Sequence, residues 1–386
     1  MNPENQILQA NAAFTKNLYA ILARKKGNVF FSPISIHAVL SMLHQGAQGD
    51  TAQVLAHTLN NPDAKSTAEG YRAVTKRLNA FKQVTLLTAN KIYGVEGEAK
   101  VRSEFAKGIE ENFKGEFEEL KVEDAAKAAK SVNDWVAEKT QKNIKSIVNE
   151  AMFKKNLSLL VVNAIFFKGE WVSKFKENFT KDDEFFVEEK NSVGVKMMHQ
   201  KGNYWYVQDE ELDAQIIEIP YKGFDVKMMV ILPTENDIEK LEAKLAKTDF
   251  GKLGKNSKLT DVHLYLPKFK MEETIELNNV LSEMGLKSIF DIKEANFKGI
   301  FDTTSLKDNI FVSDVVQKAF IEVNEGGTVA AAATRAAMVL GCAPTKSQPV
   351  TFKVDHPAVF MLLAAHGKDA DASSILFYGR LSHPRH

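Results

Sequence analysis

The sequence is poor in the features that identify most specialised classes of protein. It has a single cysteine in 386 residues, so it forms no internal disulfide, and its cysteine usage indicates no redox compartment. Its longest apolar run, LSLLVVNAIFF at 157–167, is shorter than the roughly 20 residues that cross a bilayer. Fifty basic residues balance fifty acidic ones, so the net charge favours neither nucleic acid nor a membrane surface as a partner.

The short motifs that mark common catalytic sites are also missing. There is no glycine-rich dinucleotide or phosphate loop, no Gly-x-Ser-x-Gly, no His-Glu-x-x-His and no Cys-x-x-Cys. The nine histidines are scattered, and no two have metal-ligand spacing on one helix face, so we predict no metal site. Cys342 could be a nucleophile only with a histidine that the sequence does not place beside it, and an enzyme using Cys342 stays open as an alternative.

What the chain does have is enough apolar sequence for a large core, with 44% hydrophobic residues and only ten prolines. No internal repeat, low-complexity tract or Pro/Ser-rich linker divides it, so we predict a single domain over residues 1–386. The N-terminal stretch MNPENQILQANAAF lacks the charged start and apolar run of a secretory signal. Two interpretations remain, a cytoplasmic protein and a secreted one whose signal has been removed.

The hydrophobic pattern changes along the chain from helical to strand-like. Apolar residues recur at helical spacing in several early segments, at 4–24, 33–46, 66–82, 103–113 and 125–148. Strand-like runs follow at 157–167, 225–233, 261–269, 315–323 and 373–381, with further helical stretches at 237–247 and 274–285. Helices first and strands later, without regular alternation, predict an α+β fold rather than a doubly wound sheet.

One segment fits neither pattern. NEGGTVAAAATRAAMVLGCAPTKSQP, residues 324–349, lies between two strand-like stretches, although its alanines favour a helix. Gly326 and Gly327 give it a hinge of unrestricted backbone. If residues 328–340 form an extended strand, alternate residues from Thr328 to Leu340 share one face, and the only charge in this range, Arg335, falls on the other. From these residues alone the segment is either a buried helix or a strand able to enter a sheet.

EVNEGGTVAAAAT closely resembles the hinge of the serpins, a superfamily of protease inhibitors. Six other stretches resemble the same family: NVFFSPISIHAVLSMLHQGAQGDT, LLVVNAIFFKGEW, YLPKFK, VVQKAFIEVNEGG, VDHPAVF and ILFYGRL. The resemblance covers essentially the whole chain in the family's order, and the chain looks most like the secreted inhibitors of arthropod haemolymph. It implies a serpin fold, in which a helical N-terminal part packs on three β-sheets and a reactive loop, here about 325–349, is exposed.

The resemblance implies a suicide inhibitor of a serine protease. The protease cleaves the loop and forms an acyl-enzyme, and the cleaved loop then inserts into the central sheet and carries the protease with it. The expected partner is therefore a target protease in a covalent complex, and the protein itself is a monomer without catalytic activity or a required cofactor. About a dozen new backbone hydrogen bonds, at ~0.5–1.5 kcal/mol each, make the uncleaved state metastable by on the order of ten kcal/mol.

Small side chains make insertion feasible, so the hinge favours an inhibitor over the alternative, a non-inhibitory carrier or chaperone. The hinge residues that the resemblance assigns are Glu325, Gly326, Gly327, Thr328, Val329, Ala330, Ala331, Ala332, Ala333 and Thr334.

Other positions match the parts of serpins that control opening of the central sheet. Ser32, Ser35 and Asn163 match the polar shutter behind the sheet, and Trp171 matches the breach where insertion begins. Gln317 stands where many relatives have a histidine. Because an amide donates and accepts hydrogen bonds without titrating, we do not expect a pH-sensitive shutter.

Two observations disagree about the scissile bond. The family's customary loop length, counted from the hinge, places the bond at Gly341–Cys342, with Leu340 one residue earlier, and predicts an elastase- or chymotrypsin-like target. A trypsin-like protease would instead cut at Lys346–Ser347. That cut would add five residues, 342–346, to the inserted side of the loop, which are about 16 Å long at the rise of a strand. Because this slack should weaken the compression of the trapped protease, we favour the 340–342 window.

The resemblance also suggests a heparin-like glycosaminoglycan as an activator. Arg72, Lys76, Arg77 and Lys82 lie in a stretch that matches the heparin-binding helix of some serpins. At these spacings Arg72, Lys76 and Arg77 could share a face, although charges on exposed helices usually serve only solubility. Both interpretations stay open.

Overall fold

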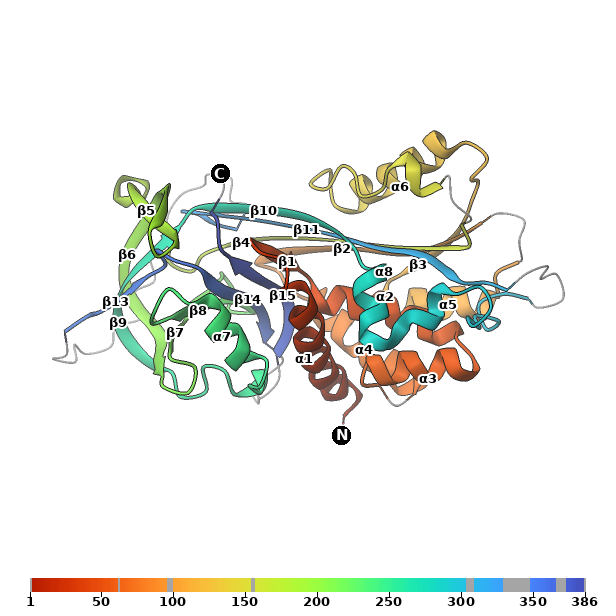
Figure 1. Ribbon diagram of the computed structural model, residues 1–386, viewed down its shortest axis with the longest axis horizontal. Helices are drawn as coiled ribbons and strands as arrows, with labels where there is room; N and C mark the ends of the chain where they lie inside the picture. The colour runs from red at the N-terminus through yellow and green to blue at the C-terminus, as the bar shows by residue number, and fades with distance from the viewer. Residues whose placement is uncertain are drawn as a thin grey trace.

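The computed structural model describes residues 2–61, 63–95, 100–153, 157–302, 309–328, 348–365 and 373–384. The molecule is elongated, and a long central sheet runs along it (Figure 1). Helices cover one face of this sheet at one end of the molecule, a second sheet fills the other end, and α6 lies on the opposite face. No helix in the described part of the chain is long and apolar enough to cross a membrane.

Eight α-helices lie in the described residues: α1 (Pro3–Leu22), α2 (Pro33–Gly46), α3 (Gly49–Thr58), α4 (Ala64–Leu78), α5 (Ser103–Phe113), α6 (Ala125–Lys139), α7 (Ile238–Leu245) and α8 (Asn278–Leu281). Four begin at an Asn or Asp whose side chain accepts a hydrogen bond from a backbone N–H of the first turn. Most match the predicted ranges, but α3 was not predicted. The predicted helix 125–148 is too long, because Gln141 and Lys142 take left-handed backbone angles just after α6.

The central sheet has six strands in the order β10, β11, β12, β4, β2, β3. Their bounds are β10 (Phe269–Glu276), β11 (Val312–Asn324), β12 (Gly327–Thr328), β4 (Leu159–Glu170), β2 (Val84–Val95) and β3 (Glu116–Leu120). The predicted helix 274–285 is therefore wrong in its first residues, which complete strand β10. Neither β2 nor β3 was predicted.

The second sheet has nine strands in the order β1, β15, β14, β8, β7, β6, β9, β13, with β5 paired to β6. Their bounds are β1 (Val29–Phe31), β15 (Ser373–Leu381), β14 (Ala358–Ala365), β8 (Val226–Pro233), β7 (Ala214–Pro220), β6 (Asn191–Asp209), β9 (Lys258–Pro267), β13 (Val350–Lys353) and β5 (Lys181–Glu188). The α+β class is confirmed. The resemblance implied three sheets, but the described residues form two. The 19-residue strand β6 pairs with β7, β9 and β5 and joins them into one sheet.

Strand β4 separates two hydrophobic cores, as its continuous apolar run predicted. Its odd-numbered apolar side chains, from Leu159 to Phe167, belong to the main core under helices α1 to α5. Its even-numbered side chains, from Leu160 to Phe166, belong to a smaller core beneath α6. Asn163 is the one polar residue in this buried stretch, and its side chain faces the main core.

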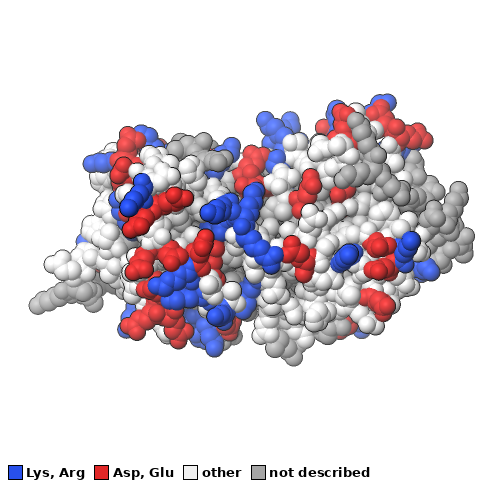
Figure 2. Space-filling view, viewed as in Figure 1, with Lys and Arg blue, Asp and Glu red and all other residues white. Residues whose placement is uncertain are grey.

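Charged side chains tie α6 to the sheet and are otherwise dispersed. The buried ammonium of Lys91 on β2 lies 2.5 Å from Glu118, 3.2 Å from Glu116 and 4.6 Å from the ring centroid of Trp135 on α6. On the face shown in Figure 2, acidic and basic side chains are interspersed, as the balanced composition predicts.

Candidate functional site

Strands β11 and β4 run parallel at the middle of the central sheet and pair directly with each other. Eight residue pairs, from Val312↔Leu159 to Phe320↔Phe166, form this contact, which we call the seam. Near its centre, Gln317 pairs with Asn163, and Asn163 pairs in turn with Asn90 on β2. Three buried amides therefore form one row across three strands, on the face that covers the main core.

Gln317 and Asn163 are hydrogen-bonded across the seam. Gln317 Nε2 donates to Asn163 Oδ1 over 2.5 Å and to the carbonyl of Ser32 over 3.0 Å. Gln317 Oε1 accepts from the backbone N–H of Ser32 over 2.8 Å. One side-chain amide thus makes two donor contacts and one acceptor contact, which the two ring nitrogens of a histidine could not reproduce.

The start of helix α2 completes this polar cluster. Ser32 precedes Pro33, which occupies the first helical turn, where no backbone N–H is needed. The hydroxyl of Ser32 donates to the carbonyl of Leu376 over 2.5 Å. Asn163 Nδ2 donates to the hydroxyl of Ser35 and, over 2.6 Å, to Asn90 Oδ1. We call Ser32, Ser35, Asn90, Asn163 and Gln317 the shutter cluster.

Trp171 lies just beyond the end of β4, at the end of the seam. Its ring is fully buried and stacks on Tyr221 with centroids 4.3 Å apart. Its Nε1 donates to the carbonyl of Asn324 over 3.0 Å, and its backbone N–H donates to Gly326 over 3.0 Å. One tryptophan therefore holds the ends of β4 and β11 together with the turn that follows β11.

Gly327 and Thr328 form the short strand β12, which lies between the ends of β11 and β4 and runs antiparallel to both. Gly327 has a φ of 142°, and a Cβ there would come within 2.1 Å of the carbonyl oxygen of Gly169, so only glycine fits. Thr328 is fully buried, and its hydroxyl lies 2.6 Å from that of Tyr221. The chain has thus begun to enter the central sheet.

Two ion-paired carboxylates flank this entry point. Lys174, 2.8 Å from Glu170, and Lys222 hold the pKa of Glu170 below its usual range. Burial alone would raise the pKa of Glu325, but hydrogen bonds from Lys268 and Thr180, at 2.9 and 2.8 Å, keep it below its usual range. Both groups are therefore ionised at neutral pH and fix the turn against β4 and its neighbours.

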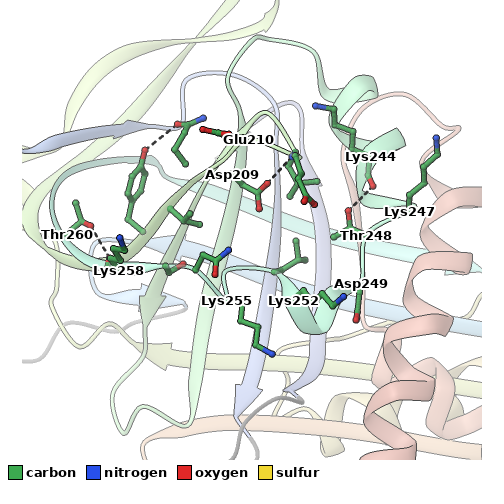
Figure 3. Close-up of a pocket in the computed structure, with 18 residues that line it drawn as sticks. Asp209, Glu210, Lys244, Lys247, Thr248, Asp249, Lys252, Lys255, Lys258 and Thr260 are labelled. Carbon is green, nitrogen blue, oxygen red and sulfur yellow. Dashed lines mark hydrogen bonds between the residues drawn. The ribbon is translucent and has the colours of Figure 1, made fainter.

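Away from the seam, a groove of about 1450 Å³ lies between the β6–β7 turn on one side and helix α7 with its following loop on the other. Figure 3 shows Asp209 and Glu210 on the turn, and Lys244 and Lys247 on and after the helix. Its lining includes no histidine and no cysteine, so it offers no thiol–imidazole pair. The described residues also contain no group of three or more His, Cys, Asp or Glu side chains able to hold a metal ion.

Comparison with known proteins assigns this architecture. The family model described as "Serpin (serine protease inhibitor)" matches residues 9–384. The chain belongs to the serpin family. It is 35% identical to antichymotrypsin-2 of Bombyx mori over 365 residues, which are 94% of this chain and 96% of that protein.

Two solved serpin structures are similar over nearly their whole length. Serpin48 of the insect Tenebrio molitor has a TM-score of 0.86 at 30% identity, and 98% of each chain is covered. Human thyroxine-binding globulin in complex with thyroxine has a TM-score of 0.86 at 26% identity, with 100% of each chain covered. Serpins are in general protease inhibitors rather than enzymes, and homologues named as inhibitors imply proteases as partners.

The structure brings four of the predicted residues, Ser32, Ser35, Asn163 and Gln317, into one cluster, and it places Trp171 apart from them at the end of the seam. It also adds partners that the sequence did not indicate. Asn90 was missed because strand β2 itself was not predicted, and Tyr221 because no motif marks it. Thr328 is the first residue of the predicted inward face. The remaining hinge and cleavage residues lie outside the described residues: Val329, Ala330, Ala331, Ala332, Ala333, Thr334, Leu340, Gly341, Cys342, Lys346 and Ser347.

The basic residues considered for heparin are in two different situations. Arg72, Lys76 and Lys82 are exposed, and Arg72 has only a loose 4.0 Å contact with Glu111. Arg77 is half-buried and donates two hydrogen bonds, of 2.7 and 3.1 Å, to the carboxylate of Glu4. Its charge is therefore already matched within the protein.

Replacing Gln317 with leucine is expected to destabilise the closed sheet. The change leaves the Ser32 N–H and Asn163 Oδ1 buried without their partner, which costs about 3 kcal/mol in the free energy of the first urea-induced unfolding transition. The exposed Gln53 on α3 is a matched control, and Gln53→Leu should change this value by less than about 0.5 kcal/mol. Equal effects of the two substitutions would contradict the role given to Gln317.

Proposed function

We propose that this serpin is an irreversible suicide inhibitor of a serine protease, which traps the acyl-enzyme by inserting its cleaved loop into the central sheet. The observation that carries the proposal is the position of Thr328, fully buried between the ends of β11 and β4 in antiparallel register with both strands. A chain continuing in that direction would follow the seam along its whole length.

The hydrogen-bond geometry of the seam explains why such insertion is favourable. A strand entering between β11 and β4 breaks one parallel ladder of eight residue pairs and forms two antiparallel ladders in its place. The number of inter-strand ladders therefore increases by one, and antiparallel pairing is somewhat more stable per residue. At ~0.5–1.5 kcal/mol for each added bond, the gain is on the order of ten kcal/mol. Release of stored strain on proteolysis is the behaviour for which serpins are the standard example.

The same geometry explains why the uncleaved chain does not insert at once. The Gln317–Asn163 hydrogen bond crosses the seam, and Trp171 ties the ends of both strands to the turn. These contacts must break before the new ladders form, so they contribute to a kinetic barrier. Cleavage frees the end of the loop and lets insertion proceed from Thr328 onward.

The inhibitor should form covalent complexes with a chymotrypsin- or elastase-like protease. Such a target fits the favoured bond near Gly341, and the Bombyx mori relative is named for chymotrypsin. Mixing the protein separately with chymotrypsin, elastase and trypsin should give, for one of the first two, a band that survives boiling in denaturant. Mass spectrometry should then find a released C-terminal peptide that begins at residue 341 or 342.

A stable complex whose released peptide begins at Ser347 would overturn the assignment of the bond but not the mechanism. Clean cleavage by all three proteases, with no complex, would contradict the mechanism itself.

Thr328→Arg is expected to convert the inhibitor into a substrate. A guanidinium at this fully buried position next to Tyr221 costs several kcal/mol of desolvation, so insertion stalls while the acyl-enzyme hydrolyses. Thr328→Ser keeps the hydroxyl and serves as the control. On the same gel, the arginine variant should give mostly cleaved protein and the serine variant mostly complex. Equal yields would contradict the proposal that inhibition needs a small side chain at the start of the inserted path.

The main alternative is a non-inhibitory carrier, the kind of function that the name of thyroxine-binding globulin indicates for that protein. The small, buried Thr328 at the start of the inserted path supports the inhibitor instead. The Thr328→Arg experiment separates the two, because a carrier would show no complex to lose.

We propose in addition that helix α4 binds a heparin-like glycosaminoglycan, and that the protein acts outside the cell, where such a partner occurs.

Heparin should then accelerate inhibition, and Lys76→Ala and Arg72→Ala should each reduce the acceleration more than Arg77→Ala, since Glu4 already pairs with Arg77. Stopped-flow inhibition rates with and without heparin measure this. Rates that heparin leaves unchanged would dispose of the glycosaminoglycan site.

A further inference from the structure

His199 on β6 and His263 on β9 form a pair on the second sheet, far along the chain from the hinge. The two strands are antiparallel neighbours at the end of the molecule remote from α3 and α5 (Figure 1). His199 is opposite Tyr265 and His263 is opposite Lys201, so the two histidines are diagonal neighbours on one face. Their rings are nearly parallel, at 7°, and His199 Nε2 lies 3.2 Å from His263 Nδ1.

This separation is close to that of two nitrogen ligands on one metal ion. Nitrogens 2.0–2.1 Å from a tetrahedral zinc ion lie about 3.3 Å apart. The present hydrogen bond also requires the lone pair of one ring nitrogen to point toward the other ring. An ion 2.0–2.1 Å from both nitrogens would lie about 1.3 Å off the line between them, so each ring would tilt to bring its lone pair onto the ion.

The surroundings hold the two rings in place and keep them accessible. The ring of His199 stacks on Tyr265, with centroids 4.3 Å apart, and Phe179 covers it at 6.4 Å. Both histidines are only half-buried, so solvent and ions reach them. Burial, followed by the neighbouring His263 and Lys181, lowers the pKa of His199, so this imidazole is neutral at pH 7 and able to bind a metal.

We propose that His199 and His263 form a binding site for a late first-row divalent cation such as Zn²⁺, Ni²⁺ or Cu²⁺. Imidazole suits these ions, whereas Ca²⁺ and Mg²⁺ prefer oxygen ligands. Since no third His, Cys, Asp or Glu among the described residues joins the pair, water completes the coordination. On binding, the hydrogen on the ring nitrogen that donates the present bond moves to the other nitrogen of the same imidazole, which frees the lone pair of the donor nitrogen for the ion.

The site would fasten the sheet at a defined place. It joins β6 to β9, and the other edge of β9 carries β13, where His263 is paired with Thr351. Strand β13 is the first one described after residues 329–347. A bound ion would therefore stabilise the strands to which the chain beyond the reactive loop is attached. This inference rests on the geometry of the pair and not on the proposed inhibition.

Isothermal titration of the metal-free full-length protein with ZnCl₂ tests the proposal. All proteins carry Cys342→Ser, so that the single thiol cannot bind zinc. We expect saturable binding of one equivalent, weakened at least tenfold by either His199→Gln or His263→Gln. His57→Gln, at an exposed position on α3, is the matched control and should bind as the parent does. Zinc should raise the thermal unfolding midpoint of the parent and the control only.

A copper titration followed by electron paramagnetic resonance gives a readout that does not depend on stability. The parent should show two coordinated ring nitrogens, and each variant of the pair should show at most one. The proposal is overturned if the parent shows no saturable zinc binding up to millimolar concentration. It is equally overturned if the two variants bind zinc as tightly as the parent does.

Discussion

The direct pairing of two parallel strands, β4 and β11, is the constraint on which the other features of this serpin depend. Parallel strands at the centre of a sheet form a ladder that an antiparallel strand could replace with two. The closed sheet is therefore a complete structure, but one with a better-bonded alternative. The hydrogen bond between Gln317 and Asn163 lies at the middle of this pairing and must break for the alternative to form.

The surrounding elements fit this arrangement. Both faces of β4 are buried, one under helices α1 to α5 and the other under α6. One edge of β4 is paired with β2, so the edge that pairs with β11 is the one at which a further strand could be added. At the end of the seam, Trp171, Tyr221 and Thr328 form a buried group in which Thr328 is paired with both β11 and β4. Glu170 and Glu325 hold the same turn through ion pairs with lysines. Under the proposed mechanism, the entry point is thus built before a protease binds, which would limit the ordering that insertion requires.

How much the sequence predicts depends on whether a feature is local. The apolar run of β4 predicted a strand buried on both faces, and Ser32-Pro33 predicted the start of α2, because each signal lies within a few residues. The helix predicted over 125–148 was too long, since nothing in the pattern revealed the left-handed backbone at Gln141. Asn90 and Tyr221 were missed for another reason. They matter through partners 50 or more residues away, and a pattern within one segment carries no register between strands. The same limit hid the His199–His263 pair, whose members lie on different strands.

The unfolding midpoint before and after a single cut in residues 329–347 tests whether the seam opens to admit the loop. A protease that is not inhibited by the protein can make the cut, and calorimetry then compares the intact and cleaved forms. If the cleaved segment enters between β11 and β4, the second ladder should raise the midpoint by tens of degrees and slow amide exchange of both strands. An unchanged midpoint, with exchange at Val316 and Val162 as in the intact protein, would show that the seam stays closed after cleavage.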